Sequence, residues 1–256
     1  MSTSEPGQFA EQSDLTPDAP SAPPATLPAV GSSNPDLIQS VTRLDRAIKE
    51  RRDTDDQLVN WWLYFLLLSW ITLGLYSIYV FFKRISRVDG FSRRKKDYYT
   101  ATVEWTRRYA DTIGQEDAVH HELSELDDEV ARAYGGDLKP LKAGLSFVLT
   151  LVTLGFYGYY VMYRLNRYWW DAQILEQDFD DKLSQAWAKL GLTRYPITFR
   201  IDQSKKRGYP MYLILSIVTL GIWGLVWDYK IHTDPDNLYS EFHSVEDTVL
   251  QTIRAH

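Results

Sequence analysis

One apolar motif occurs three times in this chain, with the form (S/T)-x-x-T-L-G-x-(Y/W). Its copies occupy residues 69–76, 150–157 and 216–223. The register extends beyond the motif: counting from the motif threonine, a small residue follows after five positions, an aromatic one after ten and a basic one after eleven. These residues are, in that order, Ser77, Gly158 and Gly224; Phe82, Tyr163 and Tyr229; and Lys83, Arg164 and Lys230. A register kept three times indicates an internal triplication, so function must be read from this unit.

Each motif lies within an uncharged block of at least 20 residues, at 59–82, 143–163 and 208–227. About 20 apolar residues suffice to cross a hydrocarbon core of about 30 Å. An amphipathic helix of a soluble protein would instead show a polar stripe. The chain also has 17 Tyr and 9 Trp, whose rings favour the headgroup boundary of a membrane. The blocks therefore predict membrane-embedded segments.

Two arrangements of the blocks in a membrane stay open: a single spanning helix, or a helical hairpin that enters and returns on one side. A peripheral or soluble arrangement is the third alternative. Single passes would divide the basic residues equally between the two sides, which gives the positive-inside rule no orientation. Hairpins would place every basic residue on the cytoplasmic side. The T-L-G centre also suits a reversal, because glycine tolerates unusual dihedral angles and threonine can bond free backbone groups. A kink or small-residue packing site in a continuous helix is the alternative for this centre.

The predicted fold class is an all-α membrane protein, in which three T-L-G-centred apolar helical hairpins or spans alternate with amphipathic cytoplasmic helices. The structural motif residues are expected to be Thr72, Gly74, Tyr76, Thr153, Gly155, Tyr157, Thr219, Gly221 and Trp223. The predicted segments are a disordered acidic Pro/Ser-rich tail (1–33), an amphipathic helix (34–58), repeat 1 (59–91), a helical linker (92–140), repeat 2 (141–175), a helix and linker (176–205), repeat 3 (206–242) and the end of a C-terminal helix (243–256).

Amphipathic helices are predicted outside the blocks from apolar residues at helical spacing. Asn34 and Pro35 suit the N-cap and the first position of the first such helix. The four apolar stripes are Leu37, Val41, Leu44 and Ile48; Val119, Leu123, Leu126 and Val130; Leu175, Phe179, Leu183, Ala186 and Leu190; and Leu238, Phe242, Val245, Val249 and Ile253. Residues 195–201 are predicted as a short strand.

Reaction chemistry has little support in the sequence. The chain has no Cys, which excludes disulfides, thiolate metal sites and cysteine nucleophiles. The adjacent His120 and His121 would point to different faces of a helix, and no HExxH motif accompanies them. Asp228 follows the third block; an acid at a membrane edge can relay protons, but more often it simply lies in the interface. We therefore predict no catalytic residue, no metal site, no cofactor and no enzyme activity.

Basic residues that follow the first block and precede the third predict contact with lipid. Each Lys or Arg near an anionic membrane surface contributes about 1 kcal/mol of attraction. The expected lipid-contact residues are Lys83, Arg84, Arg87, Arg93, Arg94, Lys95, Lys96, Lys205, Lys206 and Arg207. Plain positive-inside flanking, without lipid recognition, is the alternative. The formal net charge of −6 does not suggest nucleic acid as a partner.

The T-L-G core and the aromatic-basic step after it resemble a bacterial membrane-domain family of unknown function, whose members carry a T-L-G-I-Y-G-x-Y-W signature. The likeness covers 59–91, 141–175 and 206–242, with departures at Leu75 and Ser77 in the first copy and at Val226 in the third. The resemblance implies bacterial origin and membrane location, but no activity. Together with the distribution of basic residues, it predicts the bacterial cytoplasmic (inner) membrane, with the soluble segments in the cytoplasm.

These observations favour a non-enzymatic membrane-anchored scaffold or organising subunit, with membrane shaping by three wedges as an added role. The alternative is a small transporter or channel component that uses the repeat interface. The uncharged blocks favour the scaffold, because a conduction path usually needs polar groups at depth. The expected partner is the lipid bilayer with its anionic headgroups, and a homo-oligomer or larger membrane complex stays open.

Overall fold

The computed structural model describes residues 34–256, so the predicted tail at 1–33 lies outside the described residues. Within the described range the regular elements are all helical, which confirms the all-α prediction. The body of the molecule is built on the long helices α4 (Leu75–Thr112), α7 (Phe156–Lys189) and α9 (Ile222–Arg254). Beside them pack α1 (Pro35–Lys49) and α5 (Glu116–Gly135).

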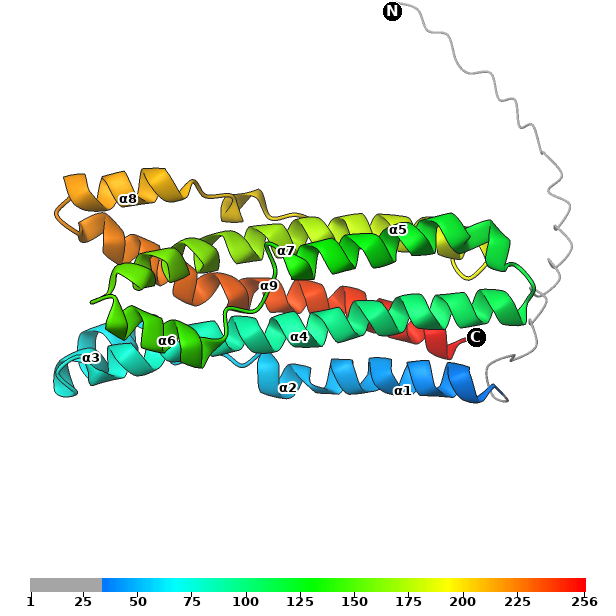
Figure 1. Cartoon of the computed structure of the whole chain (residues 1–256), viewed down its shortest axis with the longest axis horizontal. Helices are drawn as coiled ribbons and strands as arrows, with labels where there is room; N and C mark the ends of the chain where they lie inside the picture. Colours follow the sequence, from blue (N-terminus) through cyan, green and yellow to red (C-terminus); the bar gives the residue numbers. More distant parts are fainter. Residues whose placement is uncertain (1–33) are drawn as a thin grey trace, which may run out of the picture.

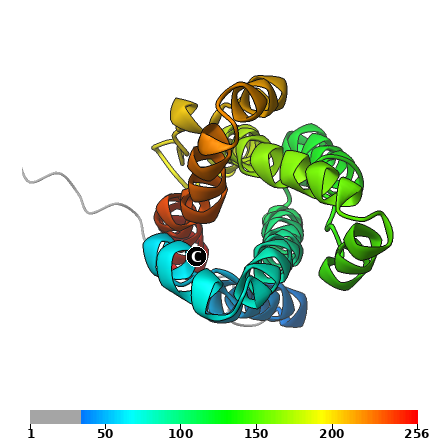
Figure 2. The same ribbon diagram turned by 90° about the vertical axis from the view of Figure 1, so that its left-hand side faces the viewer.

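A short apolar arm precedes each long helix and runs back along it. The second and third arms are α6 (Ala143–Val152) and α8 (Tyr209–Val218), whereas the first is the π-helix η2 (Leu63–Leu68) continued by α3 (Ser69–Ile71). Figure 1 shows that all three arms reverse at the same end of the molecule, and Figure 2 shows them spread around its long axis. Each arm, with the start of its long helix, is called a hairpin, numbered 1 to 3 in chain order. The other short elements are α2 (Arg51–Thr54) and the 3₁₀ turn η3 (Gln203–Lys205).

The T-L-G centres lie at these reversals, so the backbone follows the hairpin alternative and each predicted block consists of two helical arms. The second arm of each hairpin continues into the bundle without a break. Helices α4, α7 and α9 therefore run past residues 91, 175 and 242, where the sequence had suggested segment boundaries. Among the helices of residues 34–256, none is both long enough and apolar enough to cross a membrane.

The core of the bundle is formed by the predicted apolar stripes. Asn34 caps α1, because its Oδ1 accepts a hydrogen bond from the Asp36 amide at 3.0 Å, and Pro35 is the first helical residue. The stripe residues are buried except Val41 and Ile48, which are partly buried against the same core. The prediction of amphipathic helices is confirmed for all four stripes.

The predicted strand at 195–201 is wrong. Ile197 and Phe199 are buried, as their alternation suggested, but this extended segment has no neighbouring strand among the described residues. The Ile197 amide donates instead to Ser184 Oγ of α7 at 2.8 Å. A side chain of the bundle thus satisfies the backbone group that a strand partner would otherwise take.

Candidate functional site

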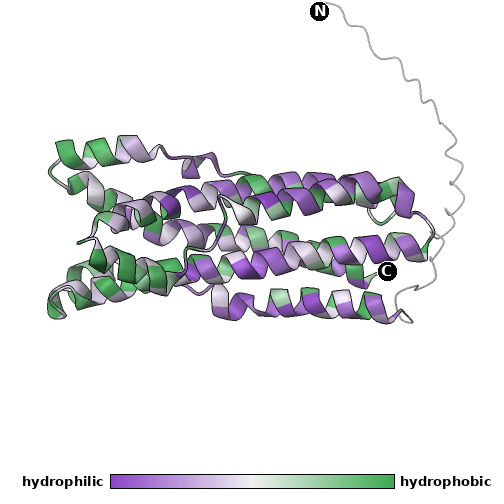
Figure 3. Ribbon diagram, in the orientation of Figure 1, coloured by the Kyte–Doolittle hydropathy of each residue, from purple (hydrophilic) through white to green (hydrophobic). Residues whose placement is uncertain are grey.

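Exposed apolar side chains gather at the end of the molecule where the three hairpins reverse, which we call the apolar end. The tip residues Leu73, Leu154 and Leu220 are 94%, 90% and 96% exposed. Figure 3 shows hydrophobic colouring over this end and mainly hydrophilic colouring along the rest of the bundle. The flanking exposed residues are Trp70, Ile71, Leu75, Val152, Phe156, Ile217, Val218 and Ile222. A concentration of this kind marks a surface that contacts a membrane or a protein partner.

The three reversals share one backbone geometry. The tip leucines have φ of 51°, 51° and 49°, and the glycines that follow them, Gly74, Gly155 and Gly221, have φ of 87°, 92° and 94°. In hairpin 2 the Gly155 amide donates to the Thr150 carbonyl at 2.7 Å, and the equivalent bonds in hairpins 1 and 3 measure 2.8 and 2.7 Å. Together with the bond from the Leu154 amide to the Leu151 carbonyl at 3.1 Å, the Gly155 bond closes the first arm as a Schellman cap, in which the left-handed position that usually holds glycine is held by the tip leucine.

The motif threonine joins the two arms across the turn. In hairpin 2, Thr153 Oγ1 donates to the Leu149 carbonyl at 2.7 Å and accepts from the Tyr157 amide at 2.9 Å. Thr72 with Tyr76, and Thr219 with Trp223, make the same pair of bonds. One hydroxyl thereby contacts both arms, and it satisfies an amide in the first turn of the second arm that has no partner within the helix.

The small residue after each turn allows the arms to approach closely. Ser69 Oγ and Ser77 Oγ lie 3.0 Å apart across hairpin 1. In hairpin 2 a Cβ atom added to Gly158 would lie 3.4 Å from Thr150 Cγ2, so this glycine gives room for the opposite arm. The sequence revealed that the position is small in all three copies, but not that its partner is the Ser or Thr that opens the motif.

Half of the predicted lipid-contact residues are buried inside the bundle, which corrects that prediction for them. Each carries its charge on a face of α4, or of the segment before α8, that packs against carboxylates from distant parts of the chain. The buried residues are Arg84, Arg87, Arg94, Lys95 and Lys205, which pair with Asp228, Asp236, Asp55, Glu246 and Asp234 among others. The Arg207 side chain is also mostly covered and pairs with Asp234. Lys83, Arg93, Lys96 and Lys206 remain at the surface.

A layer of charge crosses the centre of the bundle at Lys95. Its Nζ lies 2.6 Å from Glu176 and 3.0 Å from Glu246, while Arg94 lies 2.8 Å from Glu246 and 2.7 Å from Asp55. Burial alone would raise the pKa of the Glu246 carboxyl, but attraction by Lys95, Arg94 and a further arginine outweighs it, so the pKa is lowered. The ion pairs therefore keep Glu246 charged in a dry environment.

Asp180 is also buried, but both of its carboxyl oxygens lack a hydrogen-bond partner among the described residues. Burial raises its pKa well above the usual range, and repulsion from Glu176 raises it further. Both effects favour the neutral form of the Asp180 carboxyl group in the folded protein.

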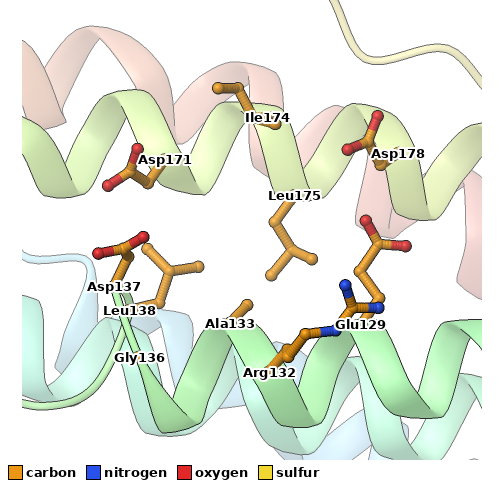
Figure 4. A pocket seen from close by; sticks show the side chains of 10 residues that line it. All are labelled: Glu129, Arg132, Ala133, Gly136, Asp137, Leu138, Asp171, Ile174, Leu175 and Asp178. Carbon is orange, nitrogen blue, oxygen red and sulfur yellow. The ribbon is translucent and has the colours of Figure 1, made fainter.

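A shallow groove of about 390 Å³ lies between α5 and α7. Figure 4 shows carboxylates from both helices around an apolar floor that includes Ala133 and Leu175. The Arg167 side chain offsets part of this negative charge, because it lies 3.3 Å from Asp137 and 2.9 Å from Asp171. Nowhere in residues 34–256 do three His, Cys, Asp or Glu side chains form a group that could hold a metal ion.

A cluster of polar side chains links hairpins 1 and 3 at the ends where the hairpins join the bundle. Asp228 accepts hydrogen bonds from Arg84 Nη2 at 3.0 Å and from Trp61 Nε1 at 2.8 Å. Arg84 Nη2 also lies 3.1 Å from His232 Nδ1, and His232 Nε2 lies 2.7 Å from the Val59 carbonyl. Asp228 thus holds two hairpins together, a role that its position in the sequence did not indicate.

Comparison with known families matches residues 207–252 to DUF4234, a domain of unknown function. The matched range contains hairpin 3 and most of α9, so the third copy carries a domain of a family without an assigned activity, as the resemblance implied. Hairpins 1 and 2 lie outside this range. Comparisons with curated proteins and with solved structures gave no match.

Proposed function

We propose that this protein is a non-enzymatic membrane-anchored scaffold, whose three hairpins insert into one leaflet of the bacterial inner membrane while the helical bundle stays in the cytoplasm. One observation carries the proposal: Leu73, Leu154 and Leu220, at three separate reversals, all present nearly fully exposed side chains at the same end of the molecule. Burial of one such side chain in an apolar medium is worth about 1.5–3 kcal/mol. Exposure of each tip to water is unfavourable by about this free energy, and the tip would recover it on entering the acyl-chain region.

The length of the hairpins supports insertion to about the middle of a bilayer. The repeated basic residues Lys83, Arg164 and Lys230 each follow the turn glycine by nine residues. Nine helical residues span about 14 Å, at 1.5 Å per residue. Half of a hydrocarbon core of about 30 Å is about 15 Å. Hairpins with their tips at the midplane would therefore place these three cations at the headgroups.

The same measure revises which cations are proposed to contact lipid. Arg93 and Lys96 are exposed, but they lie about 20 residues beyond Gly74, or about 30 Å along the helix. They would stand well outside a membrane that covers the hairpins. The proposed contacts to anionic headgroups are therefore Lys83, Arg164, Lys206 and Lys230.

Flotation with lipid vesicles tests this function. The variant Leu73→Asp/Leu154→Asp/Leu220→Asp places a charge at every tip without removing a buried contact. A matched control, Ile38→Asp/Ile174→Asp/Tyr195→Asp, adds equal charge at exposed apolar residues away from the tips. Helix content by circular dichroism checks that both variants fold. We expect the wild type and the control to float and the tip variant to stay in solution; flotation of the tip variant to the wild-type extent would reject the proposal.

A further inference from the structure

Residues that depart from the internal repeat meet at one place between hairpins 1 and 3. Nine positions after the motif threonine, Asp228 stands where the other copies have Phe81 and Met162. Twelve positions after the motif threonine, Arg84 stands where the other copies have leucine and isoleucine. Eight positions before that threonine, Tyr64 stands where the other copies have leucine and methionine. A repeat that served only to insert in lipid would not need charged and phenolic groups at otherwise apolar positions.

The departing side chains contact one another. The Arg84 guanidinium lies 5.7 Å from the centre of the Tyr64 ring, and it bonds to Asp228 through two nitrogen atoms. The Tyr64 ring stacks on His232 with centroids 5.7 Å apart. Burial lowers the pKa of His232, and the Arg84 charge lowers it further. The cluster therefore holds one cation and one anion, with a neutral imidazole.

A crevice of about 320 Å³ opens beside this cluster, between hairpin 1 and α9. We call it the inter-hairpin crevice. One set of lining residues is apolar and continues the surface of the apolar end, and the other is polar and lies deeper in the hairpin. The apolar set is Phe65, Trp70, Leu73 and Leu225, and the polar set is Tyr64, Ser69, Ser77 and Asp228.

The arm that forms one wall of the crevice has an unusual backbone. Residues 63–68 are π-helical, and Ser69 Oγ donates to the carbonyl of Tyr64, five residues earlier, at 2.9 Å. The corresponding arms α6 and α8 are ordinary α-helices. Single π-helical turns are rare and occur frequently at functional sites. The distortion, the polar lining and the break in the repeat thus coincide in hairpin 1.

We propose that the inter-hairpin crevice binds one membrane lipid with a primary ammonium headgroup, such as phosphatidylethanolamine. This inference rests on the proposed insertion of the hairpins in lipid. An acyl chain fits along Phe65, Trp70 and Leu225, because this wall is apolar and open toward the tips. The ammonium group donates to the partly exposed Asp228 carboxylate, which lies seven residues beyond the turn glycine Gly221 and therefore close to the headgroups. The aromatic ring of Tyr64, ten residues before Gly74, adds attraction for a cation.

Charge selects the headgroup. Arg84 is the cation nearest to the crevice, and its terminal nitrogens are already bonded to Asp228 and His232. A lone phosphate would therefore find no cation among the residues that line the crevice. Phosphatidylcholine has a cationic headgroup too, but it has no N–H group to donate, so it leaves the Asp228 carboxylate without that bond.

Lipid retention by the full-length protein tests the site. The protein is reconstituted in vesicles with equal parts of phosphatidylethanolamine, phosphatidylcholine and phosphatidylglycerol, extracted in mild detergent, and its retained lipid is counted by native mass spectrometry. Leu225→Trp fills the crevice, and Val226→Trp adds the same side chain at a neighbouring residue of similar exposure that does not line it. We expect phosphatidylethanolamine on the wild type and on Val226→Trp, and roughly tenfold less on Leu225→Trp.

Two further results separate this inference from the proposed function. Asp228→Asn removes the carboxylate charge without adding bulk, and should reduce the preference for phosphatidylethanolamine over phosphatidylcholine, with helix content by circular dichroism as the check on folding. Equal retention of the three lipids by the wild type, or unchanged retention by Leu225→Trp, would overturn the site. Vesicle flotation of Leu225→Trp should match the wild type, because the tips are intact; a wild-type chain that fails to float would reject the hairpin anchor itself.

Discussion

Leu154 and Gly155 stand next to each other in the left-handed region of backbone space, with φ of 51° and 92°. Glycine adopts this region freely, but a leucine there carries a strain of about 1–2 kcal/mol. Leu73 and Leu220 are held in the same way. None of the three gains burial in return, since each is at least nine-tenths exposed. Three strained and exposed leucines are unfavourable for folding alone, and the proposed insertion of the tips in lipid accounts for their presence.

The first prediction follows from this opposition between folding and binding. Leu154→Gly should raise the free energy of unfolding by about 1 kcal/mol, because it removes the strain and no buried contact. The same change should weaken vesicle binding, because it removes an apolar tip. Urea unfolding and flotation measure the two effects. A variant that is both less stable and better at binding would contradict the role assigned to the tip.

The turn glycine should be far less replaceable than a glycine elsewhere in the same hairpin. Gly155→Val forces a β-branched residue to φ near 92°, and should destabilise the protein by about 2 kcal/mol. Gly144→Val is the matched control, because Gly144 is helical and has open space around its Cα. Equal losses in the midpoint of thermal unfolding for the two variants would mean that the turn conformation is not restrictive.

The charge layer in the bundle should matter more for stability than any surface pair. Lys95→Met leaves Glu176 and Glu246 buried without their shared cation, and should cost about 3–5 kcal/mol. Lys182→Met breaks a partly exposed pair with Glu129, and should cost at most about 1 kcal/mol. Chemical unfolding of both variants provides the comparison. Similar costs would show that the buried layer is not electrostatically coupled.

The raised pKa of Asp180 predicts that the protein loses stability as the pH rises. Its pKa is raised in the folded protein, so above the ordinary Asp pKa of about 3.9 the folded state holds a proton that the unfolded state releases. One such proton lowers the free energy of unfolding by about 1.4 kcal/mol per pH unit, until the folded-state pKa is reached. Asp180→Asn should therefore be more stabilising at pH 7 than at pH 5. Parallel pH profiles for the wild type and the variant would contradict a neutral Asp180.

Local patterns in the sequence predicted the helices well because they depend on near neighbours. The stripe of Val119, Leu123, Leu126 and Val130, for example, needs only the helical period, and all four are buried. A turn at T-L-G was favoured for the same reason, since the motif contains both the permissive glycine and the hydroxyl that bonds each arm, but a continuous helix with a kink at this centre stayed open. The prediction of a strand at 195–201 failed because an alternating apolar pattern does not reveal whether a second strand is available to pair with it.

Ion pairs between residues far apart in the chain could not be predicted from a single sequence. The sequence suggested that Arg94 and Lys95 belong to a run of basic residues that contacts lipid. In the structure they lie on the inner face of α4 and pair with Glu246, some 150 residues later in the chain. The same applies to Arg84, whose partner Asp228 belongs to another hairpin. For Arg84 and Asp228 the sequence contains one signal, because both depart from the residue types of the other two copies, whereas Arg94 and Lys95 lie beyond the repeat.

The depth of the three tips in a bilayer tests the central claim most directly. Since the chain has no native cysteine, a nitroxide label can be placed singly at Leu73→Cys, Leu154→Cys and Leu220→Cys, with Tyr195→Cys as the control. Accessibility to oxygen relative to a water-soluble nickel complex reports the depth of each label. The account predicts that all three tip labels lie near the midplane, at about 15 Å from the headgroups, while the label at residue 195 stays in water. Nickel accessibility at the tips equal to that at residue 195 would contradict the account.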